Sequence, residues 1–159
     1  SNVGNWKNNF NRCLIELSKI SRLNAIGNIY VTKPYGFKKQ DDFFNTAVRL
    51  QTKDTPIQLI NKIKLIEKKL HKNKIIKNGP RRIDIDIIFF NYLKIYYKNL
   101  IIPHPRAIDR DFVLYPLCDI EPYFHHPIFR NSIKKLKTEV RSHYIKKKIT
   151  QPKGLFVIH

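Results

Sequence analysis

One short stretch, residues 83–90, constrains the fold more than any other part of the chain. Isoleucine and aspartate alternate strictly through its first half, from Ile83 to Ile87. A period of two places successive side chains on opposite faces of a β-strand. We therefore expect a strand from Ile83 to Phe90, with its isoleucines turned to the core and with Asp84 and Asp86 together on the other face.

The rest of the chain shows helical and strand periods in a clear order. Apolar residues recur at helical spacing in four segments, and two further segments are typical of strands. Thr55-Pro56 is typical of a helix N-cap followed by a first-turn proline. The expected elements are a helix over residues 5–21, strands over 26–32 and 43–52, a helix over 55–70, the strand over 83–90, and helices over 110–120 and 131–144.

This order predicts an α+β fold. Helix, strand, strand, helix, strand is the order of a ferredoxin-like βαββαβ sandwich without its first strand. We expect that sandwich, with additional C-terminal helices, in a single domain over residues 1–159. Because residue 1 comes directly before the first helix and the chain contains no methionine, we expect a truncated N-terminus, with the first strand missing from the sequence.

The formal net charge of +19 raises the question of a polyanionic partner. The lysines are spread over the whole chain, so we expect a mostly incidental basic surface and no specific nucleic-acid partner. The sequence has no long uncharged apolar run and no signal-like start, and we expect no membrane partner, a cytoplasmic location and a monomer. Cys13 and Cys118 lie far apart without neighbouring ligands and are expected to be buried, inert thiols.

The paired aspartates are the first candidate for chemistry. On a strand, Asp84 and Asp86 would lie about 6.6 Å apart and would repel each other by roughly 2.5 kcal/mol at an effective dielectric of 20. Magnesium suits such a pair, because it takes oxygen ligands and bridges carboxylates to substrate phosphates. Two metal ions could share the pair and hold both ends of a phosphoryl displacement. The alternative is a solvated strand face neutralised by nearby Arg and Lys.

A second stretch strengthens the first interpretation. Pro103-His104-Pro105-Arg106 leads to Asp109-Arg110-Asp111-Phe112, which places a histidine, two arginines and an aromatic ring in one loop. Arginine offers a planar fork for phosphate oxygens, and histidine can donate to them. A lone His104 would more often be a structural residue, so it is the combination that indicates phosphate chemistry.

With these stretches in place, the chain resembles the 6-hydroxymethyl-7,8-dihydropterin pyrophosphokinase family, from Ser1 nearly to Tyr123. The matching segments are Ser1-Asn2, Tyr30 to Gly36, Phe43-Phe44-Asn45, Glu67 with Leu70, Gly79-Pro80-Arg81 to Asp86, and Pro103-His104-Pro105-Arg106 to Pro116. Residues after about Phe124 add nothing to this resemblance. The resemblance implies that the hydroxymethyl oxygen of the pterin attacks the β-phosphorus of ATP and that AMP leaves, in folate biosynthesis.

The resemblance also implies roles for individual residues. Asp84 and Asp86 would bind two Mg²⁺ ions that hold the ATP phosphates, and they would act in catalysis with Arg81 and His104. The expected ATP-binding residues are Glu67, Lys72, Lys74, Lys77, Arg81, His104 and Arg110. The expected pterin-binding residues are Thr32, Pro34, Tyr35, Phe43, Asn45 and Phe112, with the pterin ring between Phe43 and Phe112.

The chain departs from the family pattern at three kinds of position. Lys72, Lys74 and Lys77 stand where arginine is common, and a lysine ammonium cannot replace a bidentate guanidinium. Asn78 stands where tryptophan is frequent, and Phe43 replaces a frequent tyrosine. The phosphate contacts and the closure of the site are therefore expected to differ in detail from the family pattern.

An RNA-binding module of the RRM type is the alternative function from a different class. It shares the βαββαβ order, and Lys33-Pro34-Tyr35-Gly36-Phe37 resembles the start of its signature. However, Pro34 and Lys38 break that signature, which here falls in a loop. Asp84 and Asp86 would also repel a phosphate backbone unless metal ions covered them.

Overall fold

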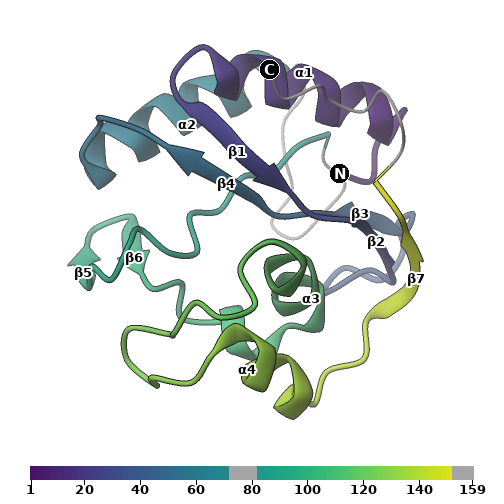
Figure 1. The fold of residues 1–159 in the computed structure, drawn as a ribbon. Coiled ribbons are helices and arrows are strands. Elements are labelled where there is room, and N and C mark those ends of the chain that lie inside the picture. The colour runs from purple at the N-terminus through teal and green to yellow at the C-terminus, as the bar shows by residue number, and fades with distance from the viewer. Residues whose placement is uncertain (72–81, 152–159) are drawn as a thin grey trace.

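The structure is a computed structural model that describes residues 1–71 and 82–151. Within these ranges the chain forms four α-helices, one 3₁₀ turn and seven short strands arranged in small antiparallel sheets, which confirms the α+β class. Helices α1 (Trp6–Ser18) and α2 (Pro56–Leu70) lie along one side of the strands, and α3 (Asp111–Ile120) and α4 (Ile133–Glu139) lie on the other (Figure 1).

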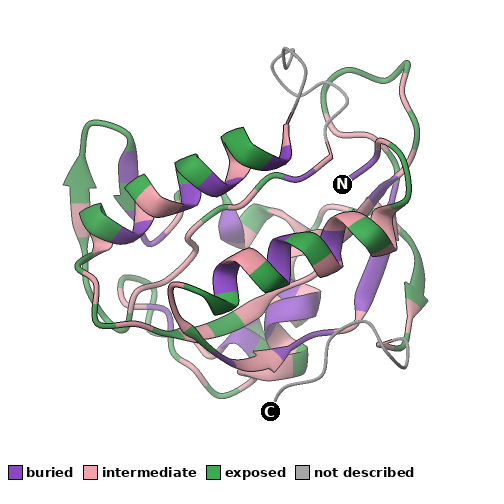
Figure 2. Cartoon of the chain, turned by 90° about the horizontal axis from the view of Figure 1, so that it is seen from above, coloured by how far each residue is buried: buried purple, intermediate pink, exposed green. Residues whose placement is uncertain are grey.

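Helices α1 and α2 both begin at a residue whose side chain caps the helix. The Asn5 side chain accepts the N–H of Asn8 at the start of α1, which begins and ends within the predicted range of 5–21. Thr55 and Gln58 form a capping box at the start of α2, as the Thr-Pro signal predicts. Each helix turns its buried residues inward and its exposed residues outward (Figure 2).

The two predicted long strands are each broken into two. Strand β1 (Arg22–Ile26) pairs with β4 (Val48–Gln51), whereas β2 (Ile29–Thr32) pairs with β3 (Phe43–Asn45). The break follows from contacts at Gly27, whose N–H donates to the Ala47 carbonyl at 2.9 Å and whose carbonyl accepts the Thr46 hydroxyl. A Cβ atom on Gly27 would lie 2.8 Å from the carbonyl oxygen of Pro116, so glycine lets α3 pack directly on this corner.

The two faces of the segment over 43–52 contact different cores. Phe44, Val48 and Leu50 pack against the core beneath α1 and α2. Ala47 packs instead against the core formed by α3 and α4. The alternation seen in the sequence therefore separates two hydrophobic cores, one on each side of the strands.

The prediction of a hydrogen-bonded strand over 83–90 is wrong, although its alternation is confirmed. Ile83 is buried, Ile85 and Ile87 pack on the same core, and Asp84 and Asp86 are exposed. The backbone polar groups of this segment bind elsewhere: the Ile85 N–H donates to the Glu67 carboxylate and the Ile88 carbonyl accepts the His104 N–H. Within the described residues, no strand pairs with this segment.

The helices of the second layer differ from prediction at one end. Helix α3 follows the predicted range closely, but α4 ends at Glu139 instead of continuing to Tyr144. The chain turns to an extended conformation at Val140, and the buried carboxylate of Asp111 accepts the Tyr144 N–H at 2.8 Å. This bond to α3 replaces the helical bond that the predicted continuation of α4 requires.

Two β elements were not predicted. Strand β7 (Ile145–Ile149) pairs with the outer edge of β2, and β5 (Ile95–Tyr97) forms a hairpin with β6 (Leu100–Ile102). A 3₁₀ turn, η1 (Ala107–Asp109), precedes α3. Strand β7 escaped prediction because its three central residues are lysines, which are poor strand formers.

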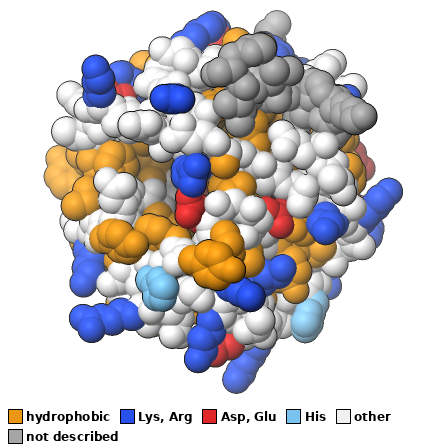
Figure 3. All heavy atoms as spheres, in the orientation of Figure 1, with side chains coloured by type: hydrophobic (Ala, Val, Ile, Leu, Met, Phe, Trp, Pro, Cys, Tyr) orange, Lys and Arg blue, Asp and Glu red, His pale blue; other side chains and the backbone are white. Residues whose placement is uncertain are grey.

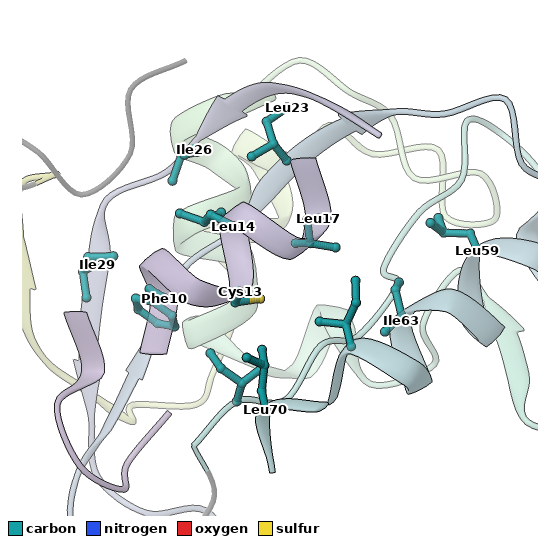
Figure 4. Packing of buried hydrophobic residues seen from close by; sticks show 12 residues of the cluster. Phe10, Cys13, Leu14, Leu17, Leu23, Ile26, Ile29, Leu59, Ile63 and Leu70 are labelled. Carbon is teal, nitrogen blue, oxygen red and sulfur yellow. The ribbon is translucent and has the colours of Figure 1, made fainter. Parts of the chain in front are cut away.

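The larger core lies between the first helix layer and the strands. Cys13, Leu14 and Leu17 of α1 belong to one buried cluster with Ile63 and Leu70 of α2 (Figure 4). Cys13 is buried as predicted, and burial raises the pKa of its thiol to about 12, which disfavours the reactive thiolate. Cys118 is half-buried, so the expectation of full burial is wrong for it.

The surface agrees with a dispersed basic charge. Lysine and arginine side chains are scattered around the face shown in Figure 3 and are not gathered in one patch. Several pair with carboxylates, including Lys62 with Asp54 and Lys146 with Asp42. Among the described residues, no helix has the length and apolar character needed to cross a membrane.

Candidate active site

A large hollow of about 1000 Å³ lies between the strands, the 83–89 segment and the start of α3. It extends from the core beneath α1 and α2 to the protein surface. The predicted site residues that line it are Thr32, Tyr35, Phe43, Asn45, Asp84, Asp86, His104, Arg110 and Phe112. Four stretches that are far apart in the sequence therefore contribute to one cavity.

One wall of the hollow is built on paired strands. Thr32 of β2 lies opposite Phe43 of β3, and both are buried. The side-chain amide of Asn45 donates to the Thr32 hydroxyl at 3.0 Å and more weakly to the Tyr30 carbonyl at 3.4 Å. These bonds fix the orientation of the Asn45 amide, so its polar edge is held in place before any ligand arrives.

Another part of the lining carries the two aspartates on the extended 83–89 segment. Asp84 and Asp86 flank Ile85, whose N–H donates to Glu67 Oε1 at 3.0 Å. Burial raises the pKa of Glu67 above its ordinary value; the Ile85 N–H and Lys64 oppose this, and the charges of Asp84 and Asp86 add to it. Glu67 therefore holds the segment through this hydrogen bond, and the charges of both aspartates act on its carboxylate.

His104 adjoins the aspartates. Its backbone N–H donates to the Ile88 carbonyl at 2.9 Å, and its Nδ1 accepts the Arg106 N–H at 3.2 Å. Burial lowers the pKa of His104 below its ordinary value, and the charge of Asp86 opposes that effect. With Nδ1 acting as an acceptor, a neutral imidazole carries its proton on Nε2, which makes that nitrogen a donor.

Arg110, directly before α3, lies over two neighbouring aromatic rings. Its guanidinium carbon is 5.1 Å from the centre of the Tyr35 ring and 5.7 Å from that of Phe112. Among the contacts of the described residues, its buried Nε–H has no hydrogen-bond acceptor. A buried donor beside a cavity is costly unless a ligand supplies the acceptor, so Arg110 is suited to hold an anionic group there.

The acidic residues fit a magnesium ion that is shared with a substrate. No cluster of three or more potential metal-binding side chains occurs in the described ranges. Asp84 and Asp86 provide hard oxygen donors at the edge of the hollow, which leaves the other coordination positions to water or phosphate. Magnesium commonly binds in this manner, through one or two carboxylates plus substrate phosphates.

The remaining predicted residues lie elsewhere. Pro34 lines a smaller neighbouring hollow, together with Lys33, Lys38 and residues 142–144. Lys72, Lys74, Lys77 and Arg81 lie outside the described residues. The predicted role of this second group in phosphate binding stays a prediction.

Comparison with known proteins identifies the family. The family description "7,8-dihydro-6-hydroxymethylpterin-pyrophosphokinase (HPPK)" matches residues 1–122. The chain is 37% identical over 139 residues to the 2-amino-4-hydroxy-6-hydroxymethyldihydropteridine pyrophosphokinase of Aquifex aeolicus, with 87% of both chains covered. It is 34% identical over 122 residues to the enzyme of the same name from Bacillus subtilis, covering 76% of this chain and 73% of that one. The chain belongs to the HPPK family.

As an HPPK, the protein is an enzyme of folate biosynthesis that acts on a pterin with ATP. It also matches part of much longer proteins. It is 40% identical over 148 residues to the folic acid synthesis protein fol1 of Pneumocystis carinii, which covers 92% of this chain but 20% of that protein. One related plant protein is named as mitochondrial, so the cytoplasmic location and the monomeric state of this HPPK stay predictions.

The structure adds two residues to this region that the sequence did not indicate. Lys33 lines the hollow, and the Tyr144 ring packs against two aromatic residues that line it, Tyr35 and Phe112. Tyr144 lies beyond the range that matches the family, at the end of the helix predicted over residues 131–144. Its contacts arise because β7 pairs with β2, and a pairing between such distant segments leaves no local signal in the sequence.

Proposed function

We propose that the hollow is the active site of this HPPK and that pyrophosphate passes there from ATP to 6-hydroxymethyl-7,8-dihydropterin. The observation that carries the proposal is the convergence of an oriented amide, two aromatic rings, paired aspartates and an unsatisfied arginine on one cavity. An apolar cavity with a few placed polar groups is the usual form of a small-molecule site.

The pterin is proposed to bind at the wall made by β2, β3 and the start of α3. Phe43 and Phe112 both line the hollow and would contact the faces of the ring. Asn45, held by Thr32, would bind a polar edge of the ring. In this arrangement the hydroxymethyl group would point towards the aspartates.

ATP is proposed to bind across the aspartate side. Asp84 and Asp86 would hold two Mg²⁺ ions, which supply Lewis-acid stabilisation of the phosphate charge when bound. Arg110 and the Nε2–H of His104 would donate to phosphate oxygens. The pterin hydroxyl oxygen forms a bond to the β-phosphorus as the bond to the α-phosphate oxygen breaks, AMP leaves, and the hydroxyl proton passes to water. Positioning and charge stabilisation supply most of the rate enhancement in such transfers.

We also propose that the complete fold is the ferredoxin-like sandwich, in which one more strand fills the inner part of the hollow, beneath α1 and α2, and leaves the outer part to the substrates. Protein interiors hold few voids larger than a water molecule, so a cavity of about 1000 Å³ lined by core isoleucines and leucines requires an occupant. Ser1 supports this placement, because it donates to the Phe44 carbonyl and accepts the Phe44 N–H. That exchange is the pattern of an antiparallel pair, and it directs a preceding segment along Thr46 and β4.

The pterin assignment is tested by truncating one aromatic wall. Phe112→Ala is expected to weaken binding of the pterin substrate about tenfold or more, because the stacking and burial of one ring are lost. Phe129→Ala is the matched control, since Phe129 is exposed and does not line the hollow. Fluorescence titration with the pterin in the presence of a non-hydrolysable ATP analogue measures both variants. Equal affinity for the two variants would contradict the assignment.

A further inference from the structure

Asp111 is buried beside the proposed site, but it does not line the hollow. Its side chain is 4% exposed, and it is the first residue of α3, between Arg110 and Phe112. Burial of a carboxylate is costly unless hydrogen bonds satisfy its oxygens. The hydrogen-bond partners of Asp111 therefore indicate its structural role.

Every described hydrogen bond of Asp111 joins the start of α3 to itself or to residues 142–145. Its Oδ2 accepts the N–H groups of Tyr144 at 2.8 Å and Ile145 at 3.0 Å, and its Oδ1 accepts the Phe112 N–H at 2.8 Å. Its own N–H donates to the Ser142 hydroxyl at 2.9 Å. The carboxylate thus fixes the point at which the chain leaves α4 and enters β7.

Tyr144 is the side chain that this connection positions. Its ring packs edge-on against Tyr35 at 5.4 Å and against Phe112 at 5.8 Å between ring centres. Its carbonyl accepts the Lys33 N–H at 3.0 Å, and the Lys33 ammonium lies 5.4 Å from the ring centre. Tyr144 therefore contacts two aromatic residues that line the hollow, although it does not line the hollow itself.

We propose that Tyr144, held by the Asp111 carboxylate, is a positioning residue that sets the pterin wall of the active site. It fixes the Phe112 ring and the loop that carries Tyr35 so that the pterin meets a preformed surface. The inference rests on the proposed function of the hollow. It extends the site to a part of the chain beyond residue 122, where the family match ends.

The test separates the Tyr144 ring from its hydroxyl. Tyr144→Ala is expected to raise the KM for the pterin about tenfold, through the loss of two ring contacts, while kcat and the KM for ATP change less than about threefold. Tyr144→Phe keeps the ring and is expected to match the wild-type enzyme. A pterin KM that is unchanged in Tyr144→Ala, or raised equally in both variants, would overturn the proposal.

A second variant tests whether Asp111 acts through Tyr144. Asp111→Asn keeps the shape but loses one acceptor oxygen, so it is expected to raise the same pterin KM, with no further increase when combined with Tyr144→Ala. Additive effects would show that Asp111 does not act through the ring. A wild-type enzyme that makes no AMP from ATP and the pterin would instead contradict the proposed function. Normal wild-type activity with a normal Tyr144→Ala variant would contradict only the positioning role.

Discussion

Replacing Asp84 or Asp86 with alanine is expected to lower turnover at least about a hundredfold, comparable to the loss of one preorganised electrostatic group. Each variant removes a carboxylate at the edge of the hollow that the proposal assigns to Mg²⁺. Asp109→Ala is the matched control, because Asp109 is exposed near the site but does not line the hollow. Turnover is measured at saturating ATP, pterin and magnesium.

The same two variants are expected to leave the stability of the apo protein nearly unchanged. Both aspartates are exposed, and surface charge interactions contribute at most about 1 kcal/mol. Urea unfolding of each variant without ligands checks this. Turnover close to wild type in both would rule out the metal assignment. A large loss of apo stability would show that the carboxylates serve the fold through nearby basic residues.

An N-terminal extension is expected to have the largest effect on stability. Adding about seven alternating β-branched and small residues before Ser1 should raise the free energy of unfolding at least about 3 kcal/mol, because apolar side chains then fill the inner part of the hollow. The Ser1–Phe44 bonds set the direction of the added strand. Urea unfolding with a two-state fit gives the free energy of each form.

Two control extensions of equal length make this experiment specific. A Gly/Ser extension is expected to give no gain, since it has no apolar side chains. A proline in the middle of the apolar extension is expected to remove most of the gain, because it cannot donate to a central strand ladder. Equal stability for all three extended forms would contradict the placement of a strand in the hollow.

The elements that the sequence predicted well are those with local signals. Helix α2 was predicted because Thr55, Pro56 and Gln58 cap it locally. The alternation around Asp84 and Asp86 predicted their shared exposure, because it reflects which side faces the core and does not depend on hydrogen bonding to a neighbour. The sequence therefore predicted which side chains of this segment are buried, although no paired strand forms there among the described residues.

The elements that failed depend on contacts between distant segments. The end of α4 is set by the Asp111 carboxylate, and β7 is set by pairing of a lysine-rich segment with β2. The β5–β6 hairpin also has little local signal, because its short Ile-Tyr-Tyr and Leu-Ile-Ile runs flank Lys98-Asn99, which lacks the glycine of the usual two-residue hairpin turns.

The candidate site shows the same division. The motif residues from Asp84 to Phe112 were identified by type and spacing, and the structure brings most of the described ones to one hollow. The Asn45–Thr32 bond and the support from Tyr144 were not readable, because each depends on strand pairing across the sheet. The spacing of residues in the sequence indicates which functional groups the site contains. Contacts between distant segments decide which of those side chains have a fixed orientation.

Product analysis tests the central claim most directly. The protein is incubated with Mg²⁺, 6-hydroxymethyl-7,8-dihydropterin and ATP labelled in turn at the β- and γ-phosphates, and nucleotides and pterins are separated. Pyrophosphoryl transfer predicts AMP, with both labels in the pterin product in equal amounts. Formation of ADP, with the γ-label alone on the pterin, would contradict the account.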